Sequence, residues 1–348
     1  MLIKKKGSGF SPAHITGFFY LPSELESSLS KTRKADLSEM SFKDILKLAK
    51  CYNKIGSVGA GFSIDKGMKS EVEISFGKLE RLKNANYPSV ECFYNNVRVD
   101  LSRFVITRFV FNSLFKYWKE KREERIGIGD VKIKIQTPLP LHAGFGLSGA
   151  AALSTAFAVN SALELKLEPQ KLFSLAHFAD IYFKGGLGDV PAEIVGGFEF
   201  RKKPGLPYLK DEENVVKLPF SQKEGKDKVV FLISERELKT ATILKDREQM
   251  KKIEKAGKEA AEKFEDEPFL SSFFELSYNF TKKAGIVPEE LKELLKRVNK
   301  EKDCQATLAL LGNTVVARGN MKKILSFFKG KGKVLEAKIT IRGAGEES

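Results

Sequence analysis

Residues 137–153 read Thr-Pro-Leu-Pro-Leu-His-Ala-Gly-Phe-Gly-Leu-Ser-Gly-Ala-Ala-Ala-Leu, and this stretch decides the fold. Before it, Val131–Gln136 is apolar at every second position, which is typical of a half-buried strand. After it, Ala150–Leu163 is rich in Ala and Leu, which favours a helix. A glycine-rich loop that ends where a helix begins directs free backbone N–H groups and the positive end of the helix dipole outward. We therefore predict an anion site, in which Ser148 either caps the helix or offers its hydroxyl to a metal ion.

Other interpretations of this loop exist. A plain strand-to-helix turn with Ser148 as its N-cap needs no ligand. The segment Gly144–Gly149 also fits the dinucleotide pattern Gly-x-Gly-x-x-Gly, but two prolines precede it and no acidic residue follows about 20 positions on in a second-strand context. The phosphate-loop pattern that ends in Gly-Lys-Ser/Thr is absent from the whole sequence.

The composition bounds the class of protein. The 348 residues suffice for one large or two ordinary domains, and 42% of them are hydrophobic. No apolar run reaches the roughly 18 residues of a membrane-spanning helix, and the first residues lack the apolar core of a signal peptide. The three cysteines (Cys51, Cys92 and Cys304) are far apart, which argues against disulfides or a zinc site and favours a reducing cytoplasm.

The net charge of +15 has two interpretations. A basic protein of this size could bind nucleic acid. However, runs such as Lys119–Arg125 and Met250–Lys263 mix both signs, which is typical of solvated faces. A nucleotide and an acidic substrate are also sufficient reason for positive clefts, so we expect no nucleic-acid partner.

Two segments near the N-terminus carry turn or loop signals. Phe10–Tyr20 predicts a short strand that leads into a turn, where His14 is either a ligand-facing or a plain turn residue. Gly56–Phe62 is a second glycine cluster, either a tight bend or a loop that touches a substrate through the Ser57 hydroxyl. The alternating apolar residues that follow predict a hairpin with Asp65–Gly67 as its turn.

A third glycine-rich segment surrounds Asp189. The preceding residues Glu168–Lys184 predict a helix on which His177 and Asp180 share a face. Alternatively, Asp180 pairs with the lysine four residues on, on a solvated face. Asp189 stands seven residues before a Gly-Gly pair that opens a strand, so it is either a helix N-cap or a carboxylate of an active site.

The pattern of predicted elements changes after about Gly205, where strands are separated by charged, amphipathic helices. This order fits an α+β domain packed beside the first. Over the whole chain we predict further helices at 42–52, 102–124, 246–265, 268–283, 288–300 and 321–328, and further strands at 229–234, within 308–317 and at 335–342.

Six segments, in order, resemble a known family: Ser11–Phe19, Gly56–Gly61, Gly144–Gly149, Gly186–Val190, Arg201–Gly205 and Leu311–Val315. They are similar to the galactose, homoserine and mevalonate kinase (GHMP) superfamily, and within it to the archaeal pantoate kinases. The resemblance implies an α+β fold of two domains, a ribosomal-protein-like N-terminal α/β domain (1–205) that bears the phosphate loop and a ferredoxin-like C-terminal α+β domain (206–348). It also implies a cytoplasmic homodimer that uses ATP and Mg²⁺ to phosphorylate the primary hydroxyl of pantoate to 4-phosphopantoate in coenzyme A biosynthesis.

The resemblance also implies roles for individual residues. Asp189 would be the catalytic base or orienting carboxylate, and Ser148 and Asp180 would hold the magnesium ion. ATP would be bound by Pro140, Gly144, Phe145, Gly146, Leu147, Ser148, Gly149 and Ala150. Pantoate would be bound by His14, Ser57, His177, Arg201 and Thr240, with Arg201 on its carboxylate. These residue types suit phosphoryl transfer, which depends on positioning and charge neutralisation by hard oxygen ligands and cations.

In the phosphate loop, Phe145, Leu147 and Gly149 stand where the family pattern has Leu, Ser and Ala. The sequence departs from the pattern at three further positions. His14 replaces the usual Lys, Asp180 the usual Glu, and Gly185 a frequent Thr. Three rival functions stay open: a sister kinase for homoserine or mevalonate, a basic RNA-binding protein and a non-catalytic nucleotide sensor. The sister kinase shares every phosphate-loop argument, whereas intact Ser148 and Asp189 argue against the sensor.

Overall fold

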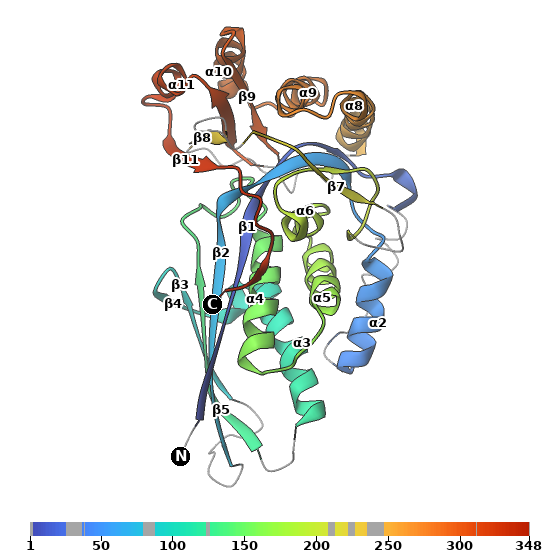
Figure 1. The fold of residues 1–348 in the computed structure, drawn as a ribbon, viewed down its shortest axis with the longest axis vertical. Helices are drawn as coiled ribbons and strands as arrows, with labels where there is room; N and C mark the ends of the chain where they lie inside the picture. Colours follow the sequence, from blue (N-terminus) through green and yellow to red (C-terminus); the bar gives the residue numbers. More distant parts are fainter. Residues whose placement is uncertain are drawn as a thin grey trace.

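The computed structural model describes residues 3–25, 37, 39–78, 88–122, 126–207, 213–221, 227–234, 247–310 and 312–347. These residues form two β-sheets, each flanked by helices (Figure 1). Thr240, predicted to bind substrate, and Leu311, which opens the sixth motif, lie outside the described residues.

The larger sheet is built on two long antiparallel strands, β1 (Ile3–Tyr20) and β2 (Val58–Lys78). The strand order is β12-β1-β2-β5-β3-β4, with β6 paired to β2 and β7 paired to β6. Its other strands are β3 (Ser89–Tyr94), β4 (Val97–Val99), β5 (Ile126–Gln136), β6 (Phe198–Arg201), β7 (Val215–Leu218) and β12 (Gly345–Glu346). Figure 1 shows β1 and β2 running from one end of the molecule to the layer of C-terminal helices.

The predicted hairpin at Asp65–Gly67 is wrong. β2 continues through these residues because β1 is long enough to pair with both of its halves. The register shifts where Pro12 pairs with Gly67 and Ala13 pairs with Ile64, so Asp65 and Lys66 form a bulge. The turn predicted at the end of Phe10–Tyr20 is wrong for the same reason, since the whole segment belongs to β1.

Helices cover one face of the larger sheet (Figure 1). The buried α4 (Leu147–Ala162) packs along β1 and β2. Its alanines and the glycines of β1 permit a close approach, since a Cβ built on Gly7 would lie 2.2 Å from the carbonyl oxygen of Ala158. The other helices on this side are α2 (Phe42–Tyr52), α3 (Val105–Lys121), α5 (Pro169–Tyr182) and α6 (Asp189–Val195). The short η2 (Leu101–Arg103) precedes α3.

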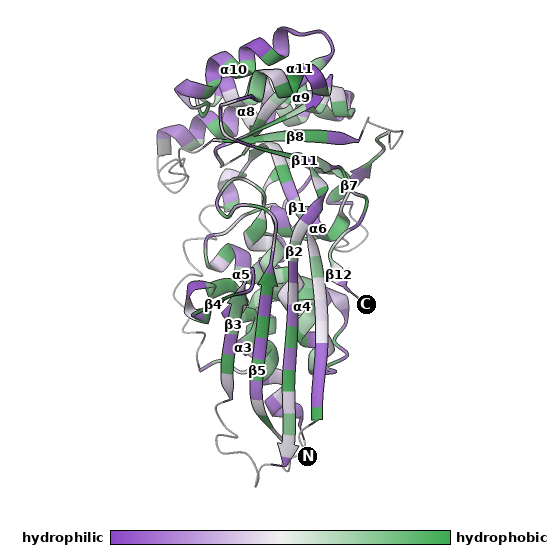
Figure 2. Ribbon diagram, turned by 90° about the vertical axis from the view of Figure 1, so that its left-hand side faces the viewer, coloured by the Kyte–Doolittle hydropathy of each residue, from purple (hydrophilic) through white to green (hydrophobic). Residues whose placement is uncertain are grey.

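The smaller sheet has the antiparallel order β11-β8-β10-β9. Numbered along the chain this is 4-1-3-2 with helices after the first and third strands, the predicted ferredoxin-like pattern. The strands are β8 (Lys228–Ile233), β9 (Cys304–Ala309), β10 (Thr314–Gly319) and β11 (Lys333–Lys338). The helices are α8 (Arg247–Asp266), α9 (Leu270–Lys283), α10 (Glu289–Lys300) and α11 (Met321–Phe328). Figure 2 shows hydrophobic colour along the strands and mostly hydrophilic colour on the outer α10.

A cluster of phenylalanines joins the two sheets. Phe18 of β1 contacts Phe264 of α8 edge to face, with ring centroids 5.5 Å apart. Phe273 of α9 contacts Phe62 at 5.7 Å and Phe198 at 5.6 Å. All five rings are fully buried, and each contributes about 1.5–3 kcal/mol to the stability of the junction.

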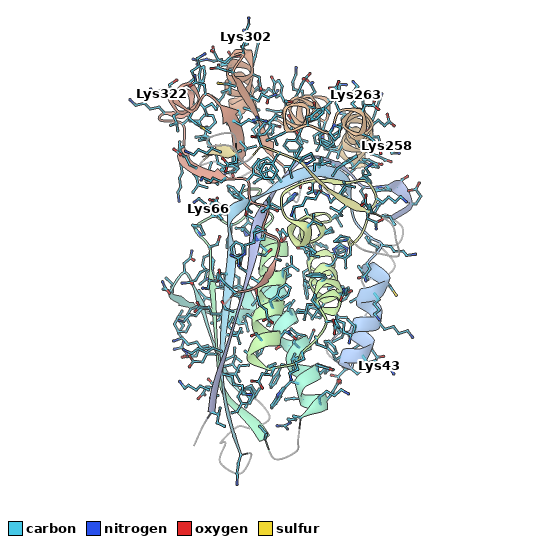
Figure 3. All side chains as sticks on the ribbon, viewed as in Figure 1. Lys43, Lys66, Lys258, Lys263, Lys302 and Lys322 are labelled. Atoms are coloured by element: carbon cyan, nitrogen blue, oxygen red, sulfur yellow. The ribbon has the colours of Figure 1, made fainter. Side chains whose placement is uncertain are left out.

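The C-terminal part of the chain returns to the first sheet, since β7 and β12 both follow residue 205 and both belong to the larger sheet. The boundary between 205 and 206 therefore stays a prediction. The lysines labelled in Figure 3 lie around the periphery of both halves, and exposed lysines such as Lys263 pair with glutamates, as the mixed-charge interpretation expects. None of the helices in the described ranges combines the length and apolar character needed to span a bilayer.

Candidate active site

The glycine-rich loop presents its backbone to the site. Helix α4 begins at Leu147 with Gly146 as its N-cap, at φ 64°, so the predicted capping role of Ser148 is wrong. Phe145 is buried against Phe231, at 5.2 Å between ring centroids, and contributes backbone only. Gly144, Gly146 and Ser148 are partly exposed, which leaves a line of accessible backbone and one hydroxyl at the start of the helix.

Contacts from both sheets hold this loop. The backbone N–H of His14 on β1 donates a hydrogen bond of 3.1 Å to the carbonyl of Phe145. On the other side, a Cβ built on Gly144 would lie 2.7 Å from the carbonyl oxygen of Ala309 on β9. The loop therefore lies where the two sheets meet, and its glycines allow the close approach of β9.

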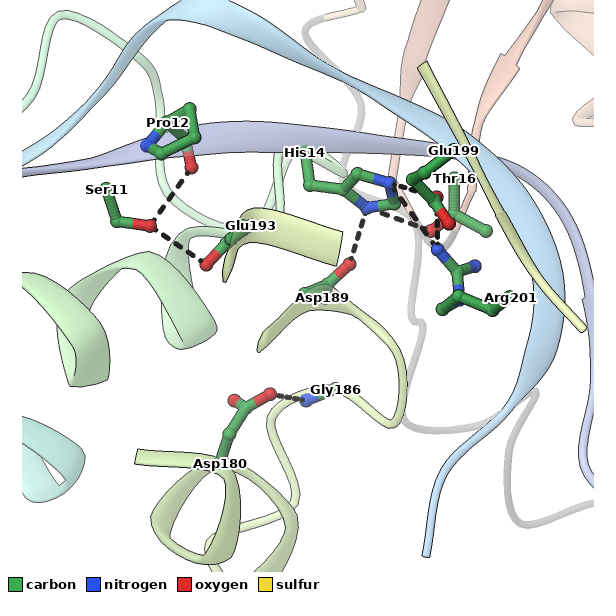
Figure 4. A network of polar contacts seen from close by, with 10 residues as sticks. All are labelled: Ser11, Pro12, His14, Thr16, Asp180, Gly186, Asp189, Glu193, Glu199 and Arg201. Atoms are coloured by element: carbon green, nitrogen blue, oxygen red, sulfur yellow. Dashed lines mark hydrogen bonds and ion pairs between the residues drawn. The ribbon is translucent and has the colours of Figure 1, made fainter. Parts of the chain in front are cut away.

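Asp180 and Ser148 converge beside the loop. Asp180 is buried on α5, which excludes the solvated-face interpretation, and its Oδ2 accepts a 3.0 Å hydrogen bond from the N–H of Gly186 (Figure 4). A Cβ built on Gly185 would lie 1.9 Å from Asp180 Oδ1 and 2.6 Å from Ser148 Oγ. Burial raises the pKa of the Asp180 carboxyl to about 8, and the charge of Asp189 adds to this rise. The buried Oδ1 has no hydrogen-bond partner among the described residues, so this pair of hard oxygen ligands fits a magnesium ion.

Asp189 opens helix α6 and points at His14 (Figure 4). Its Oδ1 lies 3.1 Å from His14 Nδ1, and its side chain is 22% exposed, so the carboxylate reaches the site. The fully buried His14 has Nε2 at 2.9 Å from Glu199 Oε1. Burial lowers the pKa of His14, but hydrogen bonds to Asp189 and Glu199 outweigh it and leave the pKa raised.

Arg201 and Ser57 converge on Gly188. The buried Arg201 guanidinium pairs through Nη1 with Glu199, and its Nε and Nη2 have no partner among the described residues. A Cβ built on Gly188 would lie 2.5 Å from Ser57 Oγ and 2.8 Å from Arg201 Nε. Because Gly188 has no side chain, the Ser57 hydroxyl and the Arg201 guanidinium pack directly against its backbone, one residue from Asp189. Together they form a corner with one hydroxyl and two N–H donors, and such donors suit a carboxylate.

His177 lies behind this corner rather than in it. Its ring is buried, and Nε2 donates a 2.8 Å hydrogen bond to the carbonyl of Ile55. Burial lowers its pKa to about 4, so the ring is neutral at physiological pH. This placement does not support the predicted direct contact with substrate; His177 instead fixes the segment that leads into Ser57.

Comparison with known proteins bears on the family. The model for the GHMP kinases N terminal domain matches residues 110–197. A pantoate kinase of Thermococcus kodakarensis is 30% identical over 308 residues, which cover 88% of this chain and 86% of that protein. The chain belongs to the GHMP kinase family. A pantoate kinase of Methanocaldococcus jannaschii is 26% identical over 315 residues, 88% of this chain and 90% of its own length.

This GHMP kinase also matches a solved structure described as a "Phosphotransferase related to CoA biosynthesis pathway". The TM-score is 0.73 at 26% identity, and the match covers 100% of this chain and 99% of the other. The predicted kinase family and its two-sheet α+β fold are therefore confirmed.

Sequence reasoning missed two buried carboxylates of this GHMP kinase, Glu193 and Glu199. Glu193 lies one turn after Asp189 on α6 and accepts a 3.2 Å hydrogen bond from Ser11 Oγ; burial raises its pKa well above the usual value. Glu199 alternates with Arg201 on β6, between phenylalanines. Two charged residues in a strand that is buried at every position are the signal that could have revealed the second.

Proposed function

We propose that this GHMP kinase is a pantoate kinase, which transfers the γ-phosphoryl group of ATP to the primary hydroxyl of pantoate in coenzyme A biosynthesis. The products would be 4-phosphopantoate and ADP. The similarity to two pantoate kinases over most of the chain supports this proposal. The observation that carries it is the Arg201 guanidinium, which packs beside Ser57 against Gly188 and whose Nε and Nη2 have no hydrogen-bond partner among the described residues.

The glycine-rich loop would bind the phosphates of ATP. Residues 144–150 combine accessible backbone with the N-terminus of the 16-residue α4, whose dipole favours anions. Ser148 and Asp180 would hold the magnesium ion. When bound, Mg²⁺ neutralises charge on the phosphates during transfer. The smaller Asp180, in place of the usual Glu, favours a contact through a water molecule.

Asp189 would act on the hydroxyl of the substrate. Its carboxylate accepts the hydroxyl proton while the hydroxyl oxygen forms the new bond to the γ-phosphorus, and the bond from that phosphorus to the bridging oxygen of ADP breaks. The partial exposure of Asp189 and its position between loop and corner suit this task.

Arg201 and Ser57 would hold the other end of pantoate. The Nε and Nη2 donors can bind both oxygens of a carboxylate, a charge-assisted pair worth about 1.5–3 kcal/mol. Gly188, at this corner, directly precedes Asp189 in the sequence. The bound carboxylate and the reacting hydroxyl would therefore be close enough to belong to one small hydroxy acid. A contact of pantoate with Thr240 stays part of the proposal.

Formation of ADP from Mg-ATP, measured in parallel with pantoate, homoserine and mevalonate, tests the substrate. We expect turnover with pantoate and at least tenfold lower kcat/KM with the other two. Preference for homoserine or mevalonate would make the protein a sister kinase. A homodimer and a cytoplasmic location also belong to the proposal, and light scattering of the purified protein tests the dimer.

A further inference from the structure

We propose, on the basis of the kinase function above, that His14 and Glu199 are positioning residues that tie the catalytic Asp189 to the carboxylate-binding Arg201. The four side chains form a network of alternating charge, in which Arg201 contacts Glu199, Glu199 contacts His14, and His14 contacts Asp189 (Figure 4). This network joins three elements, β1, β6 and the start of α6.

Each contact of the network joins named atoms at close range. Arg201 Nη1 lies 2.5 Å from Glu199 Oε1, the same oxygen that His14 Nε2 approaches at 2.9 Å. The other ring nitrogen of His14 lies 3.1 Å from Asp189 Oδ1. The hydroxyl of Thr16 also faces this nitrogen, at 3.3 Å. No member except Asp189 is exposed by more than 1%, so the other three act from behind the site.

The charge of His14 follows from its two partners. A neutral imidazole carries one N–H, whereas two carboxylates on its two nitrogens require two donors. The groups that face the ring are Asp189, Glu199 and Thr16, with the guanidinium of Arg201 3.5 Å from Nε2. The raised pKa of His14 agrees with an imidazolium in this setting. The ring thus places a cation between the carboxylates of Asp189 and Glu199.

The fold reserves space for this ring. β1 and β2 pair Thr16 with Gly61, and a Cβ built on Gly61 would lie 2.3 Å from His14 Nε2. Any side chain at position 61 would therefore push the ring away from Glu199. Gly61 also pairs with Glu199 across the ladder from β2 to β6, so one glycine permits both contacts.

The arrangement couples recognition to chemistry. Glu199 holds one edge of the guanidinium and leaves Nε and Nη2 for the substrate carboxylate. The same Glu199 fixes His14, which fixes Asp189. The position of the base and that of the carboxylate site are thus set by one scaffold, which favours hydroxy acids whose two groups match this spacing.

Three variants and one control test this network of side chains by steady-state kinetics. His14→Gln removes the cation, and we expect a loss of kcat of about 10–100-fold, the range typical when an outer-shell partner that orients a metal ligand is removed. His14→Lys should restore most of the kcat, because lysine again supplies a cation. Glu199→Gln should raise the KM for pantoate as well as lower kcat. Ser70→Ala, which removes a buried hydrogen bond between β2 and Ser154 of α4, should move neither quantity.

A measurement on the resting protein is independent of activity and of the substrate. The chain has three histidines, so ¹⁵N-histidine NMR with His14→Gln as the assignment reference identifies each ring. We expect both ring nitrogens of His14 to carry protons at pH 7, and Glu199→Gln to lower the pH at which the second proton leaves. A neutral His14 at pH 7, or variants with wild-type kcat and KM on pantoate, would overturn the inference. Absence of pantoate turnover by the wild-type protein would instead refute the proposed function. NMR would still show whether His14 is charged within the network.

Discussion

Nη1 of Arg201 lies 2.5 Å from Oε1 of Glu199, and both side chains are buried on the same face of β6. Partners two residues apart in a strand point the same way, so the ion pair is local to one short strand. Its consequence is an asymmetric guanidinium. One nitrogen is held by the protein, while Nε and Nη2 have no partner among the described side chains.

Arg201→Lys tests this open edge without removing the buried cation. A lysine can still pair with Glu199, but it cannot present two further donors to a carboxylate. We expect the KM for pantoate to rise about 10–100-fold, since a charge-assisted pair is worth about 1.5–3 kcal/mol. The kcat at saturating pantoate should fall less than the KM rises. An unchanged KM would move the carboxylate site elsewhere.

Gly188→Ala tests the same corner by adding a methyl group against Ser57 and Arg201. The new Cβ would lie 2.5 Å from Ser57 Oγ and 2.8 Å from Arg201 Nε, closer than real contacts allow. We expect at least a tenfold rise in the KM for pantoate, with little change in the affinity for ATP. Gly345→Ala is the matched control, because its Cβ would meet no atom within 4 Å. Equal kinetics for the two alanine variants would show that no ligand uses this corner.

Asp189→Asn tests the catalytic carboxylate. An amide of the same shape cannot accept the hydroxyl proton, so we expect a loss of about 10²–10⁴-fold in kcat. Binding of a non-hydrolysable ATP analogue, measured by calorimetry, should stay within a factor of a few, because the phosphate loop is intact. Near-normal kcat would remove Asp189 from the chemistry.

Much of the fold was predictable from local pattern. The helix at 42–52 was predicted with its observed bounds, because Ser41 caps it and its apolar residues recur at helical spacing. The hairpin at Asp65–Gly67 failed because turn signals in a sequence cannot show that the neighbouring strand is long enough to keep pairing. The 21 residues of β2 are held by the 18 residues of β1, in pairs that run from Tyr20 with Val58, 38 positions apart, to Ile3 with Phe76, 73 positions apart.

The site shows a similar division. The glycine-rich loop and Asp189 carry their own local signals, and the resemblance to the family supplied the role of Arg201. Glu199 has a role only because β2 pairs with β1 on one edge and with β6 on the other, which places this carboxylate on His14 across Gly61. That contact depends on the pairing of three strands, which no spacing within one segment reveals.

Gly185→Thr tests the departure at the metal site. Related kinases often carry a threonine here, and an additional hydroxyl could serve as a further ligand. In this chain the Cβ would lie 1.9 Å from Asp180 Oδ1 and 2.6 Å from Ser148 Oγ. We therefore expect the threonine to displace Asp180, raise the Mg²⁺ concentration for half-maximal activity and lower kcat at least tenfold. A gain in activity would mean that the site lacks a hydroxyl rather than space.

His177→Gln tests the pH dependence of stability. The pKa of His177 is lowered by burial to about 4 in the folded protein, against 6.5 as the ordinary value. Between these values the unfolded chain binds the extra proton, so stability is fully present above pH 6.5 and is lost as the pH falls toward 4. This group alone would contribute a slope of about 1.4 kcal/mol per pH unit to the free energy of unfolding.

Urea denaturation at pH 7, 6 and 5 should show this slope in the wild-type protein and a shallower one in His177→Gln. Because the ring holds the carbonyl of Ile55, the variant should also be less stable at pH 7, by about 1–3 kcal/mol. Parallel slopes in the two proteins would mean that the ring becomes protonated in the folded state as readily as in the unfolded chain.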